Sequence, residues 1–424
     1  MARDGDGRDP DRREPRPAPA GRRPAPRHRP PGHHEPGPGR RGPRRPDTAV
    51  PTSTLVELTF LPGLEGVLHD EVVEHLAPRR PPRPVAGRDD ALLVEVDGPL
   101  RPVLELRTAV SASIALHFAV PRPRSLTSGD HLARVVAAVR AAQLAAASSS
   151  FRFEAAGKDS AVFARLAQEV AAAIGLPHDP AGGRLVLRVR RGVLGGPAPR
   201  GGDADPGWDV LVRIGPRPLS ARRWRVVDYP GAANATIAAA MARLAGVVPE
   251  DRVVNLMGGS GTLLVERLLA GPAASAVLVD TDPDALAAAR ENAVAAGLRV
   301  LGASDAPRTG VPVELLAADA TDHVGLATAL AGTAAGGTAD LVLADPPWGG
   351  LHGSHATAEA LHTGLLRAAH GITVPGSRLA VLTHEVRVME RCVAAAALWW
   401  EPVGPPLKVF AKGHHPRIWV LRRR

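Results

Sequence analysis

A regular alternation that begins near Arg222 constrains the fold of this chain more than any other feature. Continuously apolar segments such as RVVNLM and AVLVD alternate with amphipathic ones such as GGSGTLLVERLLA. Strands of a parallel sheet are covered on both faces and are apolar throughout, whereas the helices between them keep one polar side. We therefore expect residues 219–424 to form an α/β domain with a doubly wound, mostly parallel sheet. Ligands of such sheets bind beyond the carboxyl ends of the strands.

The chain before this domain divides into three further parts. Residues 1–47 contain no Leu, Ile, Val, Phe, Trp or Tyr, so residues 1–48 are expected to be a disordered tail rich in Arg and Pro. This tail is a basic arm that holds RNA loosely, a solvated extension, or sequence upstream of the true translation start. Residues 49–122 and 123–218 each mix predicted strands, such as TLVELTF and RLVLRVRR, with amphipathic helices. We expect two small α+β domains there.

Composition narrows the classes of partner and compartment. The formal net charge is +9 and arginine supplies nearly all of the positive charge, which favours a polyanionic partner. GC-rich codons are the alternative explanation for the shortage of lysine. A single cysteine, Cys392, excludes a disulfide framework and a cysteine-based zinc site, and this fits a reducing cytoplasm. No apolar run is long enough to cross a membrane. His414 and His415 have no further ligands near them in the sequence, so no metal is expected.

Three of the strand ends in the last domain suggest a nucleotide-like cofactor. The turn NLMGGSGT, residues 255–262, joins a strand to a helix and lets the backbone approach a ligand closely. It lacks the third glycine of a dinucleotide fingerprint, which disfavours NAD. Asp280 ends the next strand and is expected to bind ribose hydroxyls, whereas Asp282 reads as a helix cap. Asp280 has no such structural duty in the sequence pattern. Asp319 follows a third strand and is expected to meet an adenine amino group; its alternative is ordinary turn chemistry.

A fourth strand, LVLAD, runs into the sequence Asp345-Pro346-Pro347-Trp348. The exocyclic amine of a purine is a poor nucleophile because its lone pair is delocalised into the ring. If Asp345 and the carbonyl of Pro346 accept its two N–H bonds, the amine is held beside an electrophilic methyl group. The two prolines fix the turn, and Trp348 offers a face on which an extruded base can stack. A rigid proline turn is the structural alternative.

Together these segments resemble the THUMP-domain RNA methyltransferases, whose members make N2-methylguanosine in tRNA or large-subunit rRNA. The resemblance rests on NLMGGSGTLLVE, DTDPDALAAARENA, DPPW, the segment YPGAANATIAAAM and the ending FAKGHHPRIWVL, and it covers nearly everything after residue 50. It implies a ferredoxin-like domain at 49–122, a THUMP RNA-binding domain at 123–218, and a Rossmann-like class I methyltransferase domain at 219–424 that uses S-adenosylmethionine. The cofactor contacts expected from the motifs and the resemblance are Asn234, Asn255, Gly258, Gly259, Gly261, Thr262, Asp280, Asp319 and Asp345.

The resemblance further implies that the first two domains grip a structured RNA, most often a tRNA. Arg188, Arg190, Arg222 and Arg223 are expected to contact its phosphates, although a solvated face is the default explanation for arginines on strands. No contact with DNA is expected. The chain departs from the family at Asn255-Leu256, where Asp-Pro is common, and at Gly258, where Cys is common, and the loss of charge predicts weaker cofactor binding. DPPW also occurs in adenine-N6 methyltransferases, so the sequence leaves several functions open. The expected function is methyl transfer to guanine N2 in tRNA. The alternatives are transfer to guanine N2 in rRNA, transfer to adenine N6, and a non-catalytic RNA-binding role.

Overall fold

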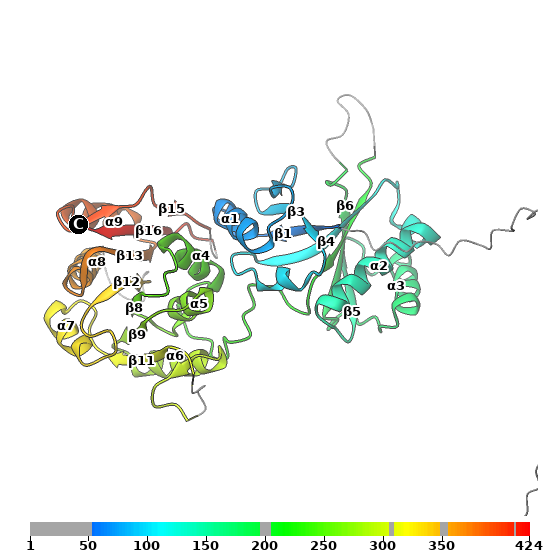
Figure 1. The fold of residues 1–424 in the computed structure, drawn as a ribbon. Coiled ribbons are helices and arrows are strands. Elements are labelled where there is room, and N and C mark those ends of the chain that lie inside the picture. Colours follow the sequence, from blue (N-terminus) through cyan, green and yellow to red (C-terminus); the bar gives the residue numbers. More distant parts are fainter. Residues whose placement is uncertain (1–52, 196–204, 305–308, 348–354, 411–412) are drawn as a thin grey trace, which may run out of the picture. The chain divides into compact units, whose positions relative to one another are not determined.

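The computed structural model describes residues 53–195, 205–304, 309–347, 355–410 and 413–424. Within them the chain forms a seven-stranded sheet followed by a nine-stranded sheet, each accompanied by helices (Figure 1). The tail expected at residues 1–48 and the expected stacking residue Trp348 lie outside the described residues.

The first sheet is mainly antiparallel. Its strand order is β2-β3-β1-β4-β7-β6-β5, and only β5 and β6 run parallel to each other. The strands are β1 (Ser53–Thr59), β2 (Arg83–Pro84), β3 (Ala91–Asp97), β4 (Ser111–Phe118), β5 (Phe151–Ala155), β6 (Leu185–Arg191) and β7 (Trp208–Arg213). The helices are α1 (Glu65–Leu76), the 3-10 helices η1 (Arg101–Glu105) and η2 (Pro123–Thr127), α2 (Gly129–Ala145) and α3 (Ala161–Ile174).

The two expected α+β domains share this one sheet. Strand β4, from the first expected domain, pairs with β7, from the second, in a register that joins Ile114 to Val212. One hydrophobic core continues across the expected boundary at residues 122 and 123, from Val56 to Ile214. The segments before and after that boundary therefore do not have separate cores, and the names ferredoxin-like and THUMP stay predictions.

The second sheet has the expected parallel core. Its order is β10-β11-β9-β8-β12-β13-β16-β14, with β15 paired to β16, and the strands from β10 to β13 run parallel. The strands are β8 (Arg252–Leu256), β9 (Ser275–Asp280), β10 (Arg299–Val300), β11 (Pro312–Ala317), β12 (Ala339–Ala344), β13 (Thr373–Thr383), β14 (Trp400–Pro402), β15 (Leu407–Lys408) and β16 (Arg417–Arg423). Only β14, β15 and β16 add antiparallel pairs at one edge.

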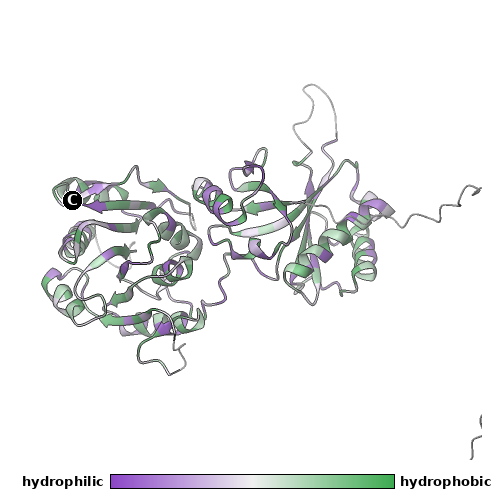
Figure 2. Cartoon of the chain, viewed as in Figure 1, coloured by the Kyte–Doolittle hydropathy of each residue, from purple (hydrophilic) through white to green (hydrophobic). Residues whose placement is uncertain are grey.

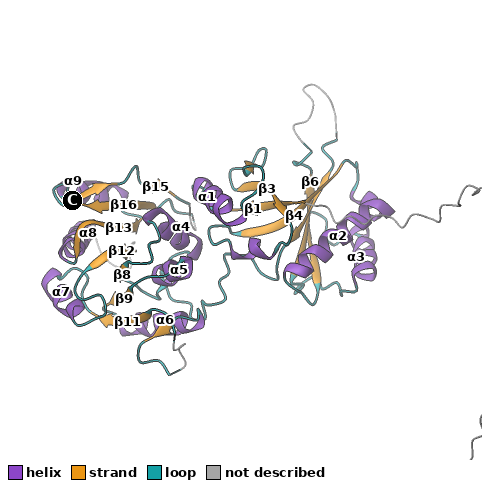
Figure 3. Cartoon of the chain, viewed as in Figure 1, coloured by secondary structure: helices purple, strands orange, loops and turns teal. Residues whose placement is uncertain are grey.

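Helices cover both faces of the second sheet, so it is doubly wound as expected. One core contains residues of α4, α5 and α6, and the other contains residues of α7, α8 and α9 (Figures 1 and 3). The bounds are α4 (Ala235–Ala245), α5 (Thr262–Ala270), α6 (Pro283–Ala295), α7 (His323–Ala331), α8 (His355–Gly371) and α9 (Val386–Ala395). Figure 2 shows hydrophobic strands between helices that have polar outer sides, which is the pattern that predicted this fold.

Helix caps explain why two of these helices begin where they do. The side chain of Asp282 accepts a hydrogen bond from the backbone N–H of Asp284, and Pro283 takes the first helical position of α6, as the sequence predicted. Asp322 caps α7 in the same way through Val324 and Gly325. Helix α7 and the short strands β10 and β14 were not predicted. The residues of α7 are almost all apolar, so the helix shows no alternation of polar and apolar sides, and β10 and β14 have only two and three residues. No helix in the described part of the chain is long and apolar enough to cross a membrane.

Candidate active site

The candidate site lies where the winding of the second sheet changes direction. From β8 the chain continues to β9 and β11 on one side, and it later returns to β12 and β13 on the other side. Strands β8 and β12 are parallel neighbours, so the turn at residues 257–261 and Asp345 emerge at the same edge of the sheet. Ligands of doubly wound sheets bind at this reversal of strand order, outside the carboxyl ends of the strands.

Asp345 lies at this edge, and one of its two carboxylate oxygens has no hydrogen-bond partner among the described residues. The residue is half-buried, but this atom, Oδ1, is fully covered. Burial raises the pKa of Asp345 to about 7, because desolvation disfavours the charged form. A buried acceptor without a donor is costly to keep, and such groups are typical of binding and catalytic sites. Pro346, the next residue, is buried and Pro347 is exposed.

The turn after β8 is tight and uses unusual backbone angles. Gly259 and Gly261 have φ values of 51° and 81°, and Met257 has a φ of 51° although it is not glycine. A non-glycine residue in this region is strained, and such strain is characteristic of functional turns. Gly258 is needed for a different reason, because an added Cβ would lie 2.4 Å from Cγ of Leu278. The leucine occupies the space that the common family cysteine would need.

Asp280 has a structural duty that the sequence analysis did not assign to it. Its Oδ2 accepts a hydrogen bond of 2.8 Å from the backbone N–H of Gly259, and its Oδ1 accepts one of 3.0 Å from Asp282. The side chain therefore fastens the glycine turn to the end of β9, and our view that it was free of local structure was wrong. A carboxylate oxygen accepts two hydrogen bonds, so the expected ribose contact stays a prediction.

Three other expected cofactor contacts have local partners in the structure. Asn234 caps α4 by accepting a hydrogen bond of 2.8 Å from the N–H of Thr236. The exposed Asp319 accepts hydrogen bonds from the N–H and the hydroxyl of Thr321, which is the ordinary turn chemistry named above as its alternative. Thr262 accepts a hydrogen bond of 2.9 Å from Arg225. Their contacts with the cofactor stay predictions.

Asn255 offers a second orphaned acceptor beside Asp345. It is fully buried at the end of β8, and its amide donates to the carbonyl oxygens of Leu256 and Leu343. Its Oδ1 atom has no hydrogen-bond partner among the described residues. Two buried acceptors at the reversal point, beside a turn with close backbone approach, fit a ligand that carries N–H donors.

The four arginines expected to contact phosphate differ in their availability. Arg190 forms a bidentate pair with the buried Glu57 at 3.0 and 2.6 Å, and Arg222 pairs with Glu266, so both guanidinium groups already have partners. Arg188 is about half exposed and pairs with Glu154 at the surface, and Arg223 is exposed. All four phosphate contacts stay predictions, and the geometry favours the two exposed arginines.

The histidines considered as metal ligands pack against aromatic rings instead. His414 lies edge-on to His384 with ring centroids 5.5 Å apart, and His415 contacts Phe410 at 5.1 Å. Burial, together with the nearby His414, lowers the pKa of His384 to about 4, so this imidazole is neutral at physiological pH. Across the described ranges, no group of three or more His, Cys, Asp and Glu side chains could hold a metal ion.

Two residues near the site were missed in the sequence. Arg225 donates to the hydroxyl of Thr262 and to the carbonyl oxygen of Ala233, so it ties the connecting segment to the start of α5. Tyr229, the single tyrosine of the chain, donates its hydroxyl to Asp282, and this bond raises the pKa of Tyr229 to about 12. Neither residue belongs to a periodic pattern, so only its place in the fold shows its role.

Comparison with known proteins agrees with this geometry. Residues 222–403 match the family model of the RMKL-like methyltransferase domain. The chain carries an RMKL-like methyltransferase domain. It is 29% identical over 330 residues to the tRNA (guanine(6)-N2)-methyltransferase of Thermus thermophilus, an alignment that covers 74% of this chain and 86% of the relative. The protein is accordingly a methyltransferase.

Two solved structures share the fold along most of the chain. TrmN from Thermus thermophilus superposes with a TM-score of 0.61 at 25% identity and covers 88% of this chain and all of its own. The protein SMU.472, solved in complex with SAH, gives a TM-score of 0.57 over 87% of this chain and 98% of its own. At 13% identity this second likeness bears on the fold alone. The second sheet with its helices therefore has the expected Rossmann-like fold, and these solved structures also cover the sheet before it.

Proposed function

We propose that this methyltransferase transfers a methyl group to the exocyclic N2 amine of a guanosine in tRNA, in the cytoplasm. The observation that carries the proposal is the buried Oδ1 atom of Asp345, which has no hydrogen-bond partner among the described residues and lies at the same sheet edge as the glycine turn. The relative from Thermus thermophilus acts on guanine N2 of tRNA according to its name, which supports the same substrate here.

The cofactor would be held at the reversal point of the second sheet. The glycine turn would receive it along the backbone, Asn255 Oδ1 would accept one of its N–H donors, and Asp280 and Asp319 would contact ribose and adenine. S-adenosylmethionine supplies an electrophilic methyl group on a sulfonium, which leaves as a neutral thioether. No metal ion is required for this transfer.

Asp345 would prepare the amine for attack. Its carboxylate and the carbonyl oxygen of Pro346 accept the two N–H bonds of the amine, which fixes the direction of the nitrogen lone pair. When the new N–C bond forms, the amine loses one proton, and Asp345 can accept it because its pKa is raised to about 7. The expected stacking of the base on Trp348 remains a prediction from the sequence.

Nucleoside mass spectrometry on tRNA tests the proposal directly. We expect tRNA from cells that lack the gene to lose N2-methylguanosine, and the purified protein with S-adenosylmethionine to restore it. Loss of a methylated nucleoside from rRNA instead would redirect the substrate, and loss of N6-methyladenosine would mean that the DPPW motif serves an adenine. Purified protein that binds S-adenosylmethionine but methylates no RNA would contradict the proposal.

A further inference from the structure

A buried carboxylate on α5 connects the methyltransferase domain to the rest of the chain. Glu266 is fully buried, and its two oxygens accept hydrogen bonds of 2.8 Å from Nε of Arg107 and 2.8 Å from Nε of Arg222. The side chain of Arg222 is also mostly buried, and that of Arg107 is about three-quarters buried. We name these three residues the Glu266 cluster.

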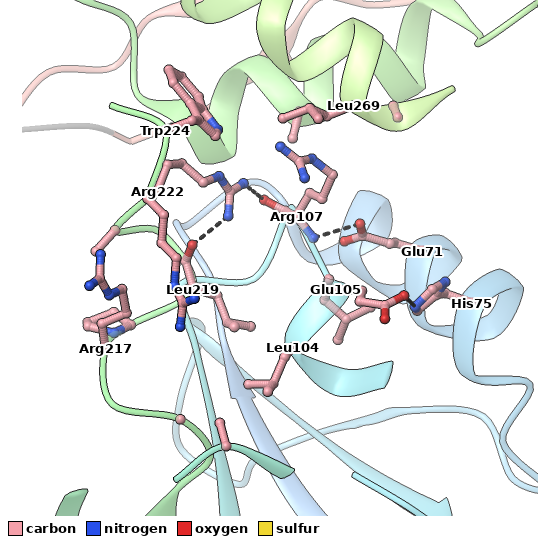
Figure 4. A pocket seen from close by; sticks show the side chains of 18 of the residues that line it. Glu71, His75, Leu104, Glu105, Arg107, Arg217, Leu219, Arg222, Trp224 and Leu269 are labelled. Carbon is pink, nitrogen blue, oxygen red and sulfur yellow. Dashed lines mark hydrogen bonds and ion pairs between the residues drawn. The ribbon is translucent and has the colours of Figure 1, made fainter. Parts of the chain in front are cut away.

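The three members come from different parts of the chain. Arg107 follows the 3-10 helix η1 beside the first sheet, Arg222 lies in the segment that connects the two sheets, and Glu266 lies on α5 of the methyltransferase domain. Arg222 also donates to the carbonyl oxygens of Arg107 and Leu219, so it fixes the connecting segment to the first sheet (Figure 4). A pocket of about 720 Å³ lies here, lined by α1, η1, the connecting segment, α4 and α5.

Both ends of the cluster are anchored. On one side Glu71 of α1 accepts the backbone N–H group of Arg107 (Figure 4). Glu71 also accepts the backbone N–H of Thr108, so the backbone that carries Arg107 is held in place. On the other side α5 begins at Thr262, directly after the glycine turn, and Arg225 of the connecting segment donates to the Thr262 hydroxyl. A displacement of the first sheet would therefore act on the helix that carries the cofactor turn.

A cluster of this kind serves orientation better than it serves stability. Burying a carboxylate and two guanidinium groups carries a desolvation cost that well-packed apolar residues would avoid. In return, charge-assisted hydrogen bonds to planar guanidinium groups hold their partners in a defined geometry. Other contacts between the two parts include the packing of Leu64 into the core of the second sheet, which is apolar and less directional. A backbone hydrogen bond from Phe410 to Pro62 and an ion pair of Arg243 with the exposed Glu74 also join them, but neither contains a buried charged group that holds two guanidinium groups at once.

We propose that Glu266 is a positioning residue: with Arg107 and Arg222 it fixes the RNA-gripping part of the chain relative to the catalytic edge, so that the target amine reaches Asp345. This inference rests on the proposed tRNA methylation. It predicts that a broken cluster leaves tRNA gripped and the cofactor bound, but delivers the amine to the wrong place. The loss should therefore appear in kcat and not in binding.

The chain contains a matched control for this test. Asp251 is also buried and also lies between two arginines, Arg267 and Arg378, but all three residues belong to the methyltransferase domain. Arg267 even adjoins Glu266 on α5. Asp251 precedes β8 and so lies at the sheet edge opposite to the catalytic one. Glu266→Gln and Asp251→Asn thus remove the same charge from similar surroundings, and only the first variant breaks a bridge between the two sheets.

Both variants would be compared with the wild-type protein for methyl transfer to tRNA, for tRNA affinity and for S-adenosylmethionine affinity. A misplacement of about 1 Å can cost roughly 100-fold in rate, so we expect Glu266→Gln to lower kcat about 10–100-fold. Its dissociation constants for tRNA and for S-adenosylmethionine should stay within about threefold of the wild-type values. Asp251→Asn should keep kcat within about twofold of wild type. Both limits lie below the roughly fivefold lower end of typical coupling between sites. A kcat ratio between the two variants of less than about fivefold would overturn the inference.

A second pair of variants covers the case in which Glu266→Gln does not fold. Arg107→Gln leaves Glu266 paired with Arg222. Its control is Arg378→Gln, which removes one of the two arginines that pair with Asp251. The two arginines are similarly buried, because 23% of the Arg107 side chain and 19% of the Arg378 side chain are exposed. The same fivefold criterion applies to their ratio of kcat values. The two proposals fail in distinguishable ways. If the wild-type protein does not methylate tRNA, the proposed function is wrong. If the wild-type protein methylates tRNA but the variant and its control have similar kcat values, only the inference about Glu266 is wrong.

Discussion

Burial changes the chemistry of Asp345 more than that of any other residue at the catalytic edge. From Leu341 onward the preceding strand β12 is apolar on both faces, and it places the carboxyl group in an environment where the pKa of Asp345 rises to about 7. The sequence identified this residue, but only the structure shows that its Oδ1 has no hydrogen-bond donor among the described residues. At the scale of single residues, an unsatisfied acceptor and a perturbed pKa together support our proposal that Asp345 is catalytic.

The first prediction concerns Asp345→Ala. We expect this change to lower kcat by about 100–1000-fold, the usual effect of removing one hydrogen-bonding group that acts in the transition state. Binding of S-adenosylmethionine, measured by calorimetry, should change little, because Asn255 and the glycine turn stay intact. If cofactor binding disappears together with activity, Asp345 has a structural role and the proposed mechanism is wrong.

The second prediction concerns pH. Only the carboxylate form of Asp345 accepts both an N–H bond and a proton, so kcat/KM should rise with pH and level off above about 7. The Asp345→Asn variant has no group that titrates at this position, and any residual activity should lack this rise. A wild-type profile that is flat between pH 6 and 8.5 would argue against a titrating Asp345.

The same group has a consequence for stability. Because the pKa of Asp345 is higher in the folded protein than in the unfolded chain, its contribution to stability is fully present below the unfolded pKa of about 4. That contribution is lost as the pH rises through about 7. We therefore compare the difference in unfolding temperature, Asp345→Asn minus wild type, at two pH values. This difference should be more positive at pH 8.5, where the wild-type carboxylate is charged, than at pH 5.

At the scale of elements, the turn between β8 and α5 shows how a strand prepares a site. Its shape depends on positive φ angles at Gly259 and Gly261 and on the bonds of Asp280 to the turn. The side chain of Leu278 on β9 packs against this turn and leaves no room for a side chain at Gly258. The sequence shows the glycines, but the reason for Gly258 is a contact with a neighbouring strand.

The third prediction follows from that contact. Gly258→Ala should destabilise the protein by about 1–3 kcal/mol, the typical cost of an overpacked core, and should weaken cofactor binding. The double variant Gly258→Ala with Leu278→Ala should lose less free energy of unfolding than the sum of the losses in the two single variants, because the smaller side chain at position 278 removes the clash. Denaturant unfolding measures this coupling, and strictly additive effects would show that the clash does not exist.

At the scale of the whole molecule, the first sheet is a single body that joins both expected RNA-binding domains. Arg188 and Arg190 both lie on β6, where they alternate with apolar residues whose side chains enter the core. Arg190 turns to the buried Glu57, whereas Arg188 stays about half exposed and available to a polyanion. Arg190 therefore contributes to the internal structure of the sheet, whereas Arg188 remains at the surface, where it can contact RNA.

The fourth prediction concerns RNA binding. Charge reversal at Arg188 and at Arg223 should weaken tRNA binding. For each lost phosphate contact, the slope of log Kd plotted against the logarithm of the salt concentration should fall by about one. The affinity for S-adenosylmethionine should not change. Arg391→Glu is a suitable control, because Arg391 is equally exposed but lies on α9 of the methyltransferase domain. Equal losses in all three variants would indicate a general charge effect in place of specific contacts.

The sequence by itself determined the local features: the parallel strands, most helices, the cap at Asp282 and the sheet edge that the glycine turn and Asp345 share. These features follow from periodicity and from residues a few positions apart, and such information is contiguous in the chain. Only the tertiary structure decided that two expected domains share one sheet, that Asp280 holds the glycine turn, and that Arg190 and Arg222 face buried carboxylates. Each of these depends on the pairing of residues far apart in the sequence, such as Arg107 with Glu266, and no local pattern encodes which distant carboxylate a guanidinium group will meet.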